Sequence, residues 1–174
     1  RARLELRRRA SDLALFNLAI DSKLRGCDLV RLKVDDVAAG GQVKTRGVIV
    51  QKKTGRPVQF EITEQTRTAV AALIARHNLT ASDYLFPSRL ASSPHLSTRQ
   101  YARIVQGWVR SIGLNPATYG THSLRRTKAA LIYRKTGNLR AVQLLLGHTK
   151  LESTVRYLGV EVDDALAISE GVDL

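Results

Sequence analysis

Residues 121–158 read THSLRRTKAALIYRKTGNLRAVQLLLGHTKLESTVRYL and form the most clearly patterned part of the chain. Apolar residues recur there at the spacing of a helical face, and two glycine-bearing turns interrupt the recurrence. The stretch therefore predicts three successive helices with short connections, over residues 121–135, 139–146 and 151–158.

Upstream of this stretch, one segment departs from the helical spacing of apolar residues and is rich in β-forming residues. Two β-rich runs, Gly47–Gln51 and Pro57–Ile62, flank Lys52-Lys53-Thr54-Gly55-Arg56, as is typical of a hairpin with a glycine-bearing turn. Helices are expected over residues 3–20, from an N-cap at Ser22 to about residue 32, from a cap at Thr63 to about residue 77, and over residues 97–112. Loops are expected at Asp35-Asp36, at Gly40-Gly41 and over residues 79–94. The predicted fold class is α+β, mainly α-helical with a small antiparallel β-sheet or hairpin, in a single domain over residues 1–174.

The chain is strongly basic. Its 174 residues include 28 Lys and Arg against 15 Asp and Glu, a formal net charge of +13. Five of the acidic residues and none of the basic ones fall in residues 161–174, so the first 160 residues carry +18. Such a charge favours a polyanionic partner, nucleic acid first, because each phosphate that Lys or Arg neutralises releases counterions. A solvated basic surface would have the same composition.

Composition also disfavours two classes of protein. Cys27 is the one cysteine, so the chain can form neither an internal disulfide nor a cysteine-based zinc site. No apolar run approaches the roughly 18 residues that a membrane span requires. The sequence is therefore expected to belong to a soluble protein from a reducing compartment, without a membrane partner.

His122 and Arg125 are three residues apart, which places both on one face of the predicted helix. Arg supplies a planar fork of donors that matches two phosphate oxygens, and His donates a hydrogen bond or moves a proton near neutral pH. The pair suits a phosphate ligand. A solitary His-x-x-Arg on a basic helix, however, is more often surface decoration.

Four further residues complete an ordered set: Arg25 in a short predicted helix, Lys53 at the hairpin tip, His148 after Gly147, and Tyr157 nine residues later. With the blocks at 121–125, 145–149 and 155–158, this set resembles the tyrosine recombinase (phage integrase) family. The catalytic domain of that family carries Arg, Lys, His-x-x-Arg, Gly-His and a Tyr nucleophile in this order. The resemblance covers essentially the whole chain and implies the family's DNA breaking-rejoining fold.

The resemblance implies a site-specific DNA recombinase or integrase that cuts and rejoins strands through a 3′-phosphotyrosine bond. Arg25 and Arg125 would hold the scissile phosphate, Lys53 would be the general acid, and Tyr157 the nucleophile. His122 and His148 would donate hydrogen bonds or shuttle protons. Neither a nucleotide cofactor nor a metal is implied, nor is a small-molecule substrate.

The partners implied are double-stranded DNA and further copies of the chain, as a dimer or tetramer on paired sites. The protein would be cytoplasmic and nucleoid-associated, of bacterial or phage type. The acidic, partly apolar segment 160–174 is expected to dock in trans on a neighbouring protomer. Family members usually carry an N-terminal helical domain that completes a clamp around DNA. Its expected absence here would make the chain a fragment or a short single-domain member.

Alternatives remain at two levels. Lys52 competes with Lys53, because a slip of one residue in hairpin register would exchange them; Lys53 is preferred because Lys-Thr-Gly matches the family's turn. A type IB topoisomerase would have a similar site but usually has Lys where this chain has His122. A catalytically silent DNA-binding accessory protein would keep the fold for recognition only.

One geometric requirement follows from the spacing of His148 and Tyr157. Nine residues turn an α-helix through about 900°, so the two side chains would face opposite sides of one straight helix. We therefore expect His148 to lie in a turn before the last helix, and Tyr157 to lie near the end of that helix or on a separate short turn.

Overall fold

The computed structural model describes residues 1–6, 10–90 and 92–159. Its helices are α1 (Ala2–Leu6), α2 (Ala10–Ser22), α3 (Gly26–Leu29), α4 (Val34–Val37), α5 (Glu64–His77), α6 (Thr98–Ser111), α7 (Thr121–Thr136), α8 (Leu139–Leu146) and α9 (Leu151–Leu158). Its strands are β1 (Ala38–Ala39), β2 (Gln42–Val43), β3 (Arg46–Val50) and β4 (Pro57–Glu61). The mainly helical α+β class is confirmed. The segment 160–174, with its expected docking in trans, lies outside the described residues.

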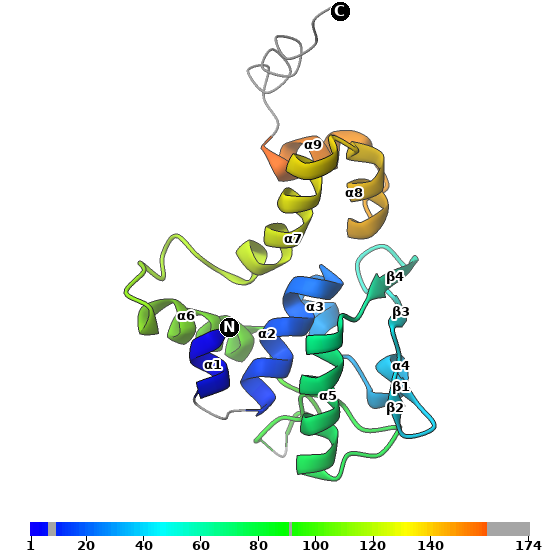
Figure 1. Ribbon diagram of the computed structural model, residues 1–174, viewed down its shortest axis with the longest axis vertical. Helices are drawn as coiled ribbons and strands as arrows, with labels where there is room; N and C mark the ends of the chain where they lie inside the picture. The colour runs from blue at the N-terminus through cyan, green and yellow to red at the C-terminus, as the bar shows by residue number, and fades with distance from the viewer. Residues whose placement is uncertain (7–9, 91, 160–174) are drawn as a thin grey trace, which may run out of the picture.

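The main body, which comprises α1–α6 and the strands, is built around α2 (Figure 1). Ala14, Leu15, Leu18 and Ala19 of this helix are all buried, because α5 packs along one side of it and α7 contacts another. A fully buried Leu side chain contributes about 1.5–3 kcal/mol to folding. None of the helices in the described part of the chain is long and apolar enough to cross a membrane.

The predicted hairpin is confirmed. Strands β3 and β4 pair antiparallel, with Arg46 opposite Glu61 and Val50 opposite Pro57. The turn between them is closed by Gln51 N, which donates to Arg56 O at 2.9 Å. Gly47 is required in β3, because a Cβ there would lie 2.5 Å from the ring of Phe60 on β4.

The expected N-cap at Ser22 is wrong. Ser22 is the last residue of α2, where its hydroxyl donates to Leu18 O at 2.6 Å and accepts from Leu24 N at 3.3 Å. The next helix, α3, begins only after Arg25, whose backbone is extended. The Ser22 hydroxyl therefore bonds the last turn of α2 instead of capping the start of α3. Arg25 lies between these two helices.

Two expected loops differ in part. Asp35 and Asp36 lie in the short helix α4, where the Asp36 carboxylate accepts from Lys33 N at 2.8 Å and so caps the first turn. Gly40 and Gly41 do form a turn, but it joins the short antiparallel strands β1 and β2. Both glycines have positive φ, 57° and 77°, which other residues adopt at a cost.

The three C-terminal helices form a small unit, hereafter the α7–α9 unit, which Figure 1 shows above the main body. Its core consists of Ala129, Val142 and Leu146, with Tyr157 packed against them. Asn138 caps α8 by accepting from Ala141 N at 2.9 Å, and glycines in the left-handed conformation end α7, α8 and α9. The predicted bounds of the last two helices are confirmed.

Candidate active site

Arg125 lies at the centre of the candidate site although its side chain is only 3% exposed. From the second turn of α7 it reaches the turn between α8 and α9, where Nη2 donates to the carbonyl oxygen of Leu146 at 2.8 Å. Nη1 is buried and has no hydrogen-bond partner within the described residues. A buried N–H group without a partner is costly. This nitrogen is therefore a donor available to an anionic ligand.

His148 lies in the turn before α9, as the spacing predicted. Its Nδ1 and the buried Thr154 hydroxyl are 3.1 Å apart and share a hydrogen bond, while Nε2 faces Nη2 of Arg125 at 3.5 Å. Burial, then the charges of Arg125 and Arg25, lower the pKa of His148 to about 4. The ring is therefore neutral at pH 7, held in one orientation by Thr154.

Tyr157 lies near the end of α9 with its ring between two of these groups. The ring is 5.7 Å from the Arg125 guanidinium carbon and meets the His148 ring edge-on at 5.4 Å between centroids. The phenol hydroxyl donates to the backbone oxygen of His122 at 3.4 Å. Burial raises the pKa of Tyr157, and the nearby charge of Arg125 opposes that rise. The cation that would stabilise a phenolate is therefore already beside it.

His122 is placed differently from the other members of the set. It follows Thr121, the first residue of α7, and its side chain is exposed. The described contact between His122 and Tyr157 uses the histidine backbone and not the imidazole. His122 therefore borders the site, while Arg125 on the same helix is buried in it.

Arg25 joins the site through a residue that the sequence did not single out, Gln51. Arg25 Nη1 donates to Gln51 Oε1 at 2.5 Å, and Gln51 Nε2 donates to Leu146 O at 3.4 Å, the same oxygen that Arg125 binds. Gln51 is 1% exposed, and it fits because residue 147 is glycine: a Cβ there would lie 2.9 Å from Gln51 Nε2. The amide thus couples the two arginines.

Lys53 does not contact the other five. It lies in the exposed hairpin turn between β3 and β4, and so does Lys52. Within the described part of the chain neither ammonium group has a hydrogen bond or ion pair. The turn as a whole is held to the main body, because Lys52 N donates to the Asp28 carboxylate at 2.9 Å. Both lysines therefore remain candidates on a tethered turn.

Asp28 is a second residue that the sequence analysis missed. It is buried, three residues after Arg25, and one of its carboxylate oxygens has no partner among the described residues. Its negative charge also raises the pKa of Arg125, against the larger effect of burial. The i, i+3 spacing from Arg25 could have indicated Asp28. Strand alternation could have indicated Gln51, which shares the inward face of β3 with Gly47 and Ile49.

The arrangement places fixed cationic donors beside a phenol. Arg125 supplies an unpartnered N–H group, Arg25 is held nearby through Gln51, and the neutral His148 ring closes one side. Preorganised donors of this kind stabilise charge that develops in a transition state without having to reorganise. The geometry suits attack by the Tyr157 oxygen on a phosphate diester.

The depressed pKa of His148 gives a first prediction. In the free protein its imidazole should titrate with a midpoint of about 4, and NMR of the ring nitrogens would measure this. Between pH 6.5 and 4 the unfolded chain binds a proton that the folded chain does not, so stability should fall as pH falls through this window. Arg125→Gln should raise the midpoint, because it removes a neighbouring cation. A midpoint near 6.5 in the wild-type protein would contradict the burial and the arginine contacts.

Comparison with known proteins identifies relatives of this chain. Residues 5–163 match the Phage integrase family. The probable integrase/recombinase YoeC of Bacillus subtilis is 29% identical over 162 residues, which cover 93% of this chain and 84% of YoeC. The tyrosine recombinase XerD of Bradyrhizobium diazoefficiens is 30% identical over 124 residues, covering 66% of this chain and 39% of XerD. The chain thus spans most of YoeC but less than half of that XerD.

Solved structures share the fold. The XerA recombinase superposes with a TM-score of 0.74 at 19% identity, over 94% of this chain and 57% of XerA. The XerH site-specific recombinase, in its pre-cleavage complex with difH substrate, also has a TM-score of 0.74, at 21% identity over 92% of this chain and 46% of XerH. The chain therefore belongs to the phage integrase family, and its described part has the fold of a tyrosine recombinase catalytic domain.

Proposed function

We propose that this chain is the catalytic domain of a site-specific DNA recombinase that cleaves and rejoins strands through a 3′-phosphotyrosine intermediate. The observation that carries the proposal is the buried Arg125 with its unpartnered Nη1, held beside the ring of Tyr157. Family membership and the net charge of +13 support a DNA substrate. XerH, which has the same fold, was solved bound to its difH substrate.

Cleavage would proceed as one balanced displacement at phosphorus. The Tyr157 oxygen forms a bond to the scissile phosphorus as it loses its proton, and the bond from phosphorus to the 5′ oxygen breaks. Arg25 and Arg125 bind the non-bridging oxygens, on which charge accumulates. The phenol proton passes to the His122 imidazole or to water. The neutral His148 ring donates a hydrogen bond to a phosphate oxygen when its one proton is on Nε2 and Nδ1 accepts from the Thr154 hydroxyl. The phosphotyrosine bond keeps the energy for religation.

The departing 5′ oxygen requires a proton, which we assign to Lys53 on the exposed turn. General acid catalysis typically contributes 10²–10⁴-fold. Lys53→Ala should therefore slow cleavage by about a hundredfold or more on ordinary DNA. The loss should disappear when sulfur replaces the bridging 5′ oxygen, because a thiolate leaves without a proton. Lys52→Ala is the matched control, and the opposite pattern of rescue would assign the acid to Lys52.

Recombination exchanges strands between two sites, so the proposal includes assembly of the chain as a dimer or tetramer on DNA at the nucleoid. The acidic segment 160–174 is proposed to make a contact between protomers. Because the chain spans only about half or less of the XerD relatives, these partners belong to the proposal for the complete protein.

Covalent capture tests the proposed function. The probe is a pool of nicked duplexes with a randomised core, in which cleavage beside the nick releases a short fragment and traps the protein on DNA. We expect adducts that survive SDS and disappear on proteolysis, and sequencing them gives the preferred site. Folded protein that binds the duplexes without any adduct would favour the silent accessory protein. Adducts that rejoin only a resupplied copy of their own released fragment, and never a strand of a second duplex, would favour a topoisomerase-like activity.

A further inference from the structure

The two arginines of the candidate site belong to different parts of the fold. Arg25 precedes α3 in the main body, whereas Arg125 lies on α7 in the α7–α9 unit. The core of this unit is small. The unit contacts the main body mainly where α7 packs on α2 and where α8 packs on β4. The spacing of the two arginines therefore depends on how α7 is seated on α2.

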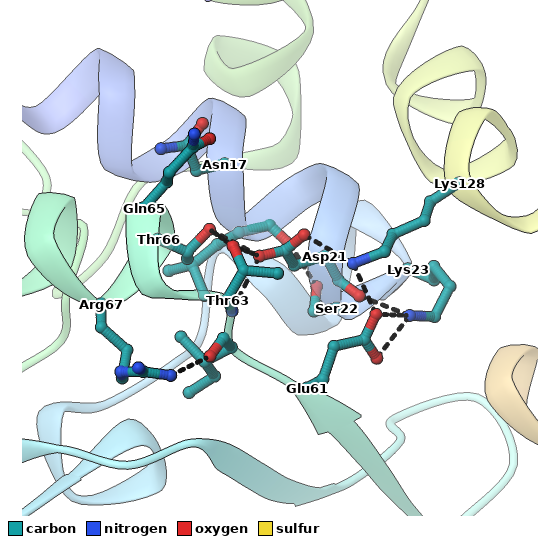
Figure 2. Close-up of polar contacts among 12 residues, drawn as sticks. Asn17, Asp21, Ser22, Lys23, Glu61, Thr63, Gln65, Thr66, Arg67 and Lys128 are labelled. Atoms are coloured by element: carbon teal, nitrogen blue, oxygen red, sulfur yellow. Dashed lines mark hydrogen bonds and ion pairs between the residues drawn. The ribbon is translucent and has the colours of Figure 1, made fainter.

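A cluster of four charged side chains lies at this junction, hereafter the lysine–carboxylate cluster: Asp21, Lys23, Glu61 and Lys128 (Figure 2). Lys128 Nζ pairs with Asp21 Oδ1 at 2.8 Å and with Glu61 Oε1 at 2.6 Å. Asp21 lies in the last turn of α2, Glu61 ends β4, and Lys128 extends from α7. Lys128 is thus the member that comes from the α7–α9 unit.

The two carboxylates are held in place by groups other than Lys128. Asp21 is 3% exposed, and its Oδ2 accepts from Thr63 N and from the hydroxyls of Thr63 and Thr66 at 2.6–3.1 Å. Both oxygens of Glu61 accept from Lys23 Nζ at 2.9 Å. The main body therefore presents a prearranged socket for the Lys128 ammonium.

Lys23 shows that this socket is maintained at some cost. Its side chain is fully buried, and its backbone has a φ of 54°, a left-handed conformation uncommon for residues other than glycine. Burial lowers the pKa of Lys23, although Glu61 opposes the effect. A buried lysine with strained backbone persists only where its surroundings determine it. The contacts to Glu61 and to the backbone oxygen of Asp21 do so here.

Two members of the lysine–carboxylate cluster lie close in sequence to the two arginines of the candidate site. Lys128 follows Arg125 by three residues, so both side chains leave the same face of α7 towards the main body. Lys23 precedes Arg25 by two residues. A slide or tilt of α7 on α2 would break the ion pairs of Lys128 and displace Arg125 together.

We propose that Lys128 is a positioning residue, which seats α7 in the Asp21–Glu61 socket so that Arg125 and Arg25 stand at the spacing that holds one phosphate. This inference rests on the proposed function for its consequence, but not for its geometry. Lys128 does not contact the phosphate in this account. It acts through Arg125.

The kinetic test is single-turnover cleavage at saturating protein. Its substrate is a suicide duplex, that is, a nicked duplex of the kind described above with the site sequence that covalent capture identifies. Lys128→Met keeps the length of the side chain and removes its charge. We expect the rate constant to fall about 10- to 100-fold, because small displacements of catalytic groups have effects of this size. The amplitude and the Kd for DNA should stay within about twofold. Lys128→Arg should recover most of the rate, and the exposed Lys135→Met on the same helix should react as wild type.

Two outcomes of this test would overturn the proposal. A reduced amplitude with an unchanged rate constant would mean that Lys128 only keeps the protein folded. Rate losses that multiply in Lys128→Met with Arg125→Gln would mean that Lys128 acts independently of Arg125. A positioning role instead predicts that the double variant reacts no more slowly than Arg125→Gln alone.

A second measurement requires no DNA and so separates this proposal from the proposed function. Spin labels at Ala72→Cys on α5 and Arg134→Cys on α7, in a Cys27→Ser background, report the distance between the main body and the α7–α9 unit. Both labelled positions are exposed. Lys128→Met should shift or broaden the distance distribution, and Lys128→Arg should not. Identical distributions for wild type and Lys128→Met would contradict the seating of α7 by Lys128, whether or not the chain cleaves DNA.

Discussion

Replacing Tyr157 with Phe is expected to abolish covalent attachment to the captured suicide duplex, a loss of at least about a thousandfold. The substitution removes one oxygen, which is the proposed nucleophile. The ring should remain in place, because it packs against the Arg125 guanidinium and the His148 ring, and the 3.4 Å bond from its hydroxyl to His122 O is long. DNA affinity and the thermal unfolding midpoint should therefore change little.

The matched control for this variant is Tyr119→Phe. Tyr119 is exposed in the connection that precedes α7, and it should react as wild type. Denaturing gels of the reaction with labelled DNA measure both variants. An adduct formed by Tyr157→Phe at more than a trace of the wild-type rate would assign the nucleophile elsewhere.

The second large effect is expected for Arg125→Gln, which should lower the cleavage rate constant by about 10²–10³-fold or more at saturating protein. Loss of a single preorganised donor to developing charge has this magnitude. Arg125 supplies such a donor through Nη1 and also orders Leu146 O through Nη2. Arg125→Lys should recover only part of the rate, because an ammonium group cannot form the planar two-nitrogen contact.

A neutral scissile group separates charge stabilisation from loss of structure in this variant. A methylphosphonate at the cleaved position lacks one anionic oxygen, so the penalty of Arg125→Gln should be smaller on it than on the phosphate. Exposed Arg134→Gln on the same helix is the control, with no expected change. Equal penalties on the two substrates would show that Arg125 only maintains the fold.

Local signals account for the parts of the fold that the sequence predicted well. Helix α8 was placed to the residue because Asn138 caps its start and Gly147 ends it, both within a few residues of the helix itself. Ser22 misled because its hydroxyl serves equally well to start a helix or to bond the preceding turn. The choice depends on the packing of α2 in the main body, which local sequence does not contain.

The residues of the candidate site also differ in how well local sequence predicts them. Arg125, His148 and Tyr157 fall within one short segment, so their grouping follows from three helices and their turns. Gln51 was missed because its role arises from a contact with Leu146, 95 residues away. Lys128 reads as a solvated lysine on a basic helix, and its partner Asp21 is 107 residues distant. Strand alternation can indicate that Gln51 points inward, but the partners of Gln51 and Lys128 are tertiary contacts, which a local pattern does not specify.

Cleavage is proposed to link DNA through its 3′ phosphate to the oxygen of Tyr157. Mass spectrometry of the captured adduct, after digestion of the protein and of the DNA, tests it directly. We expect one modified peptide, in which a nucleotide is joined through a 3′ phosphate to Tyr157, and a released strand with a free 5′ hydroxyl. A nucleotide on Tyr133 or any other residue, or a link through a 5′ phosphate, would contradict it.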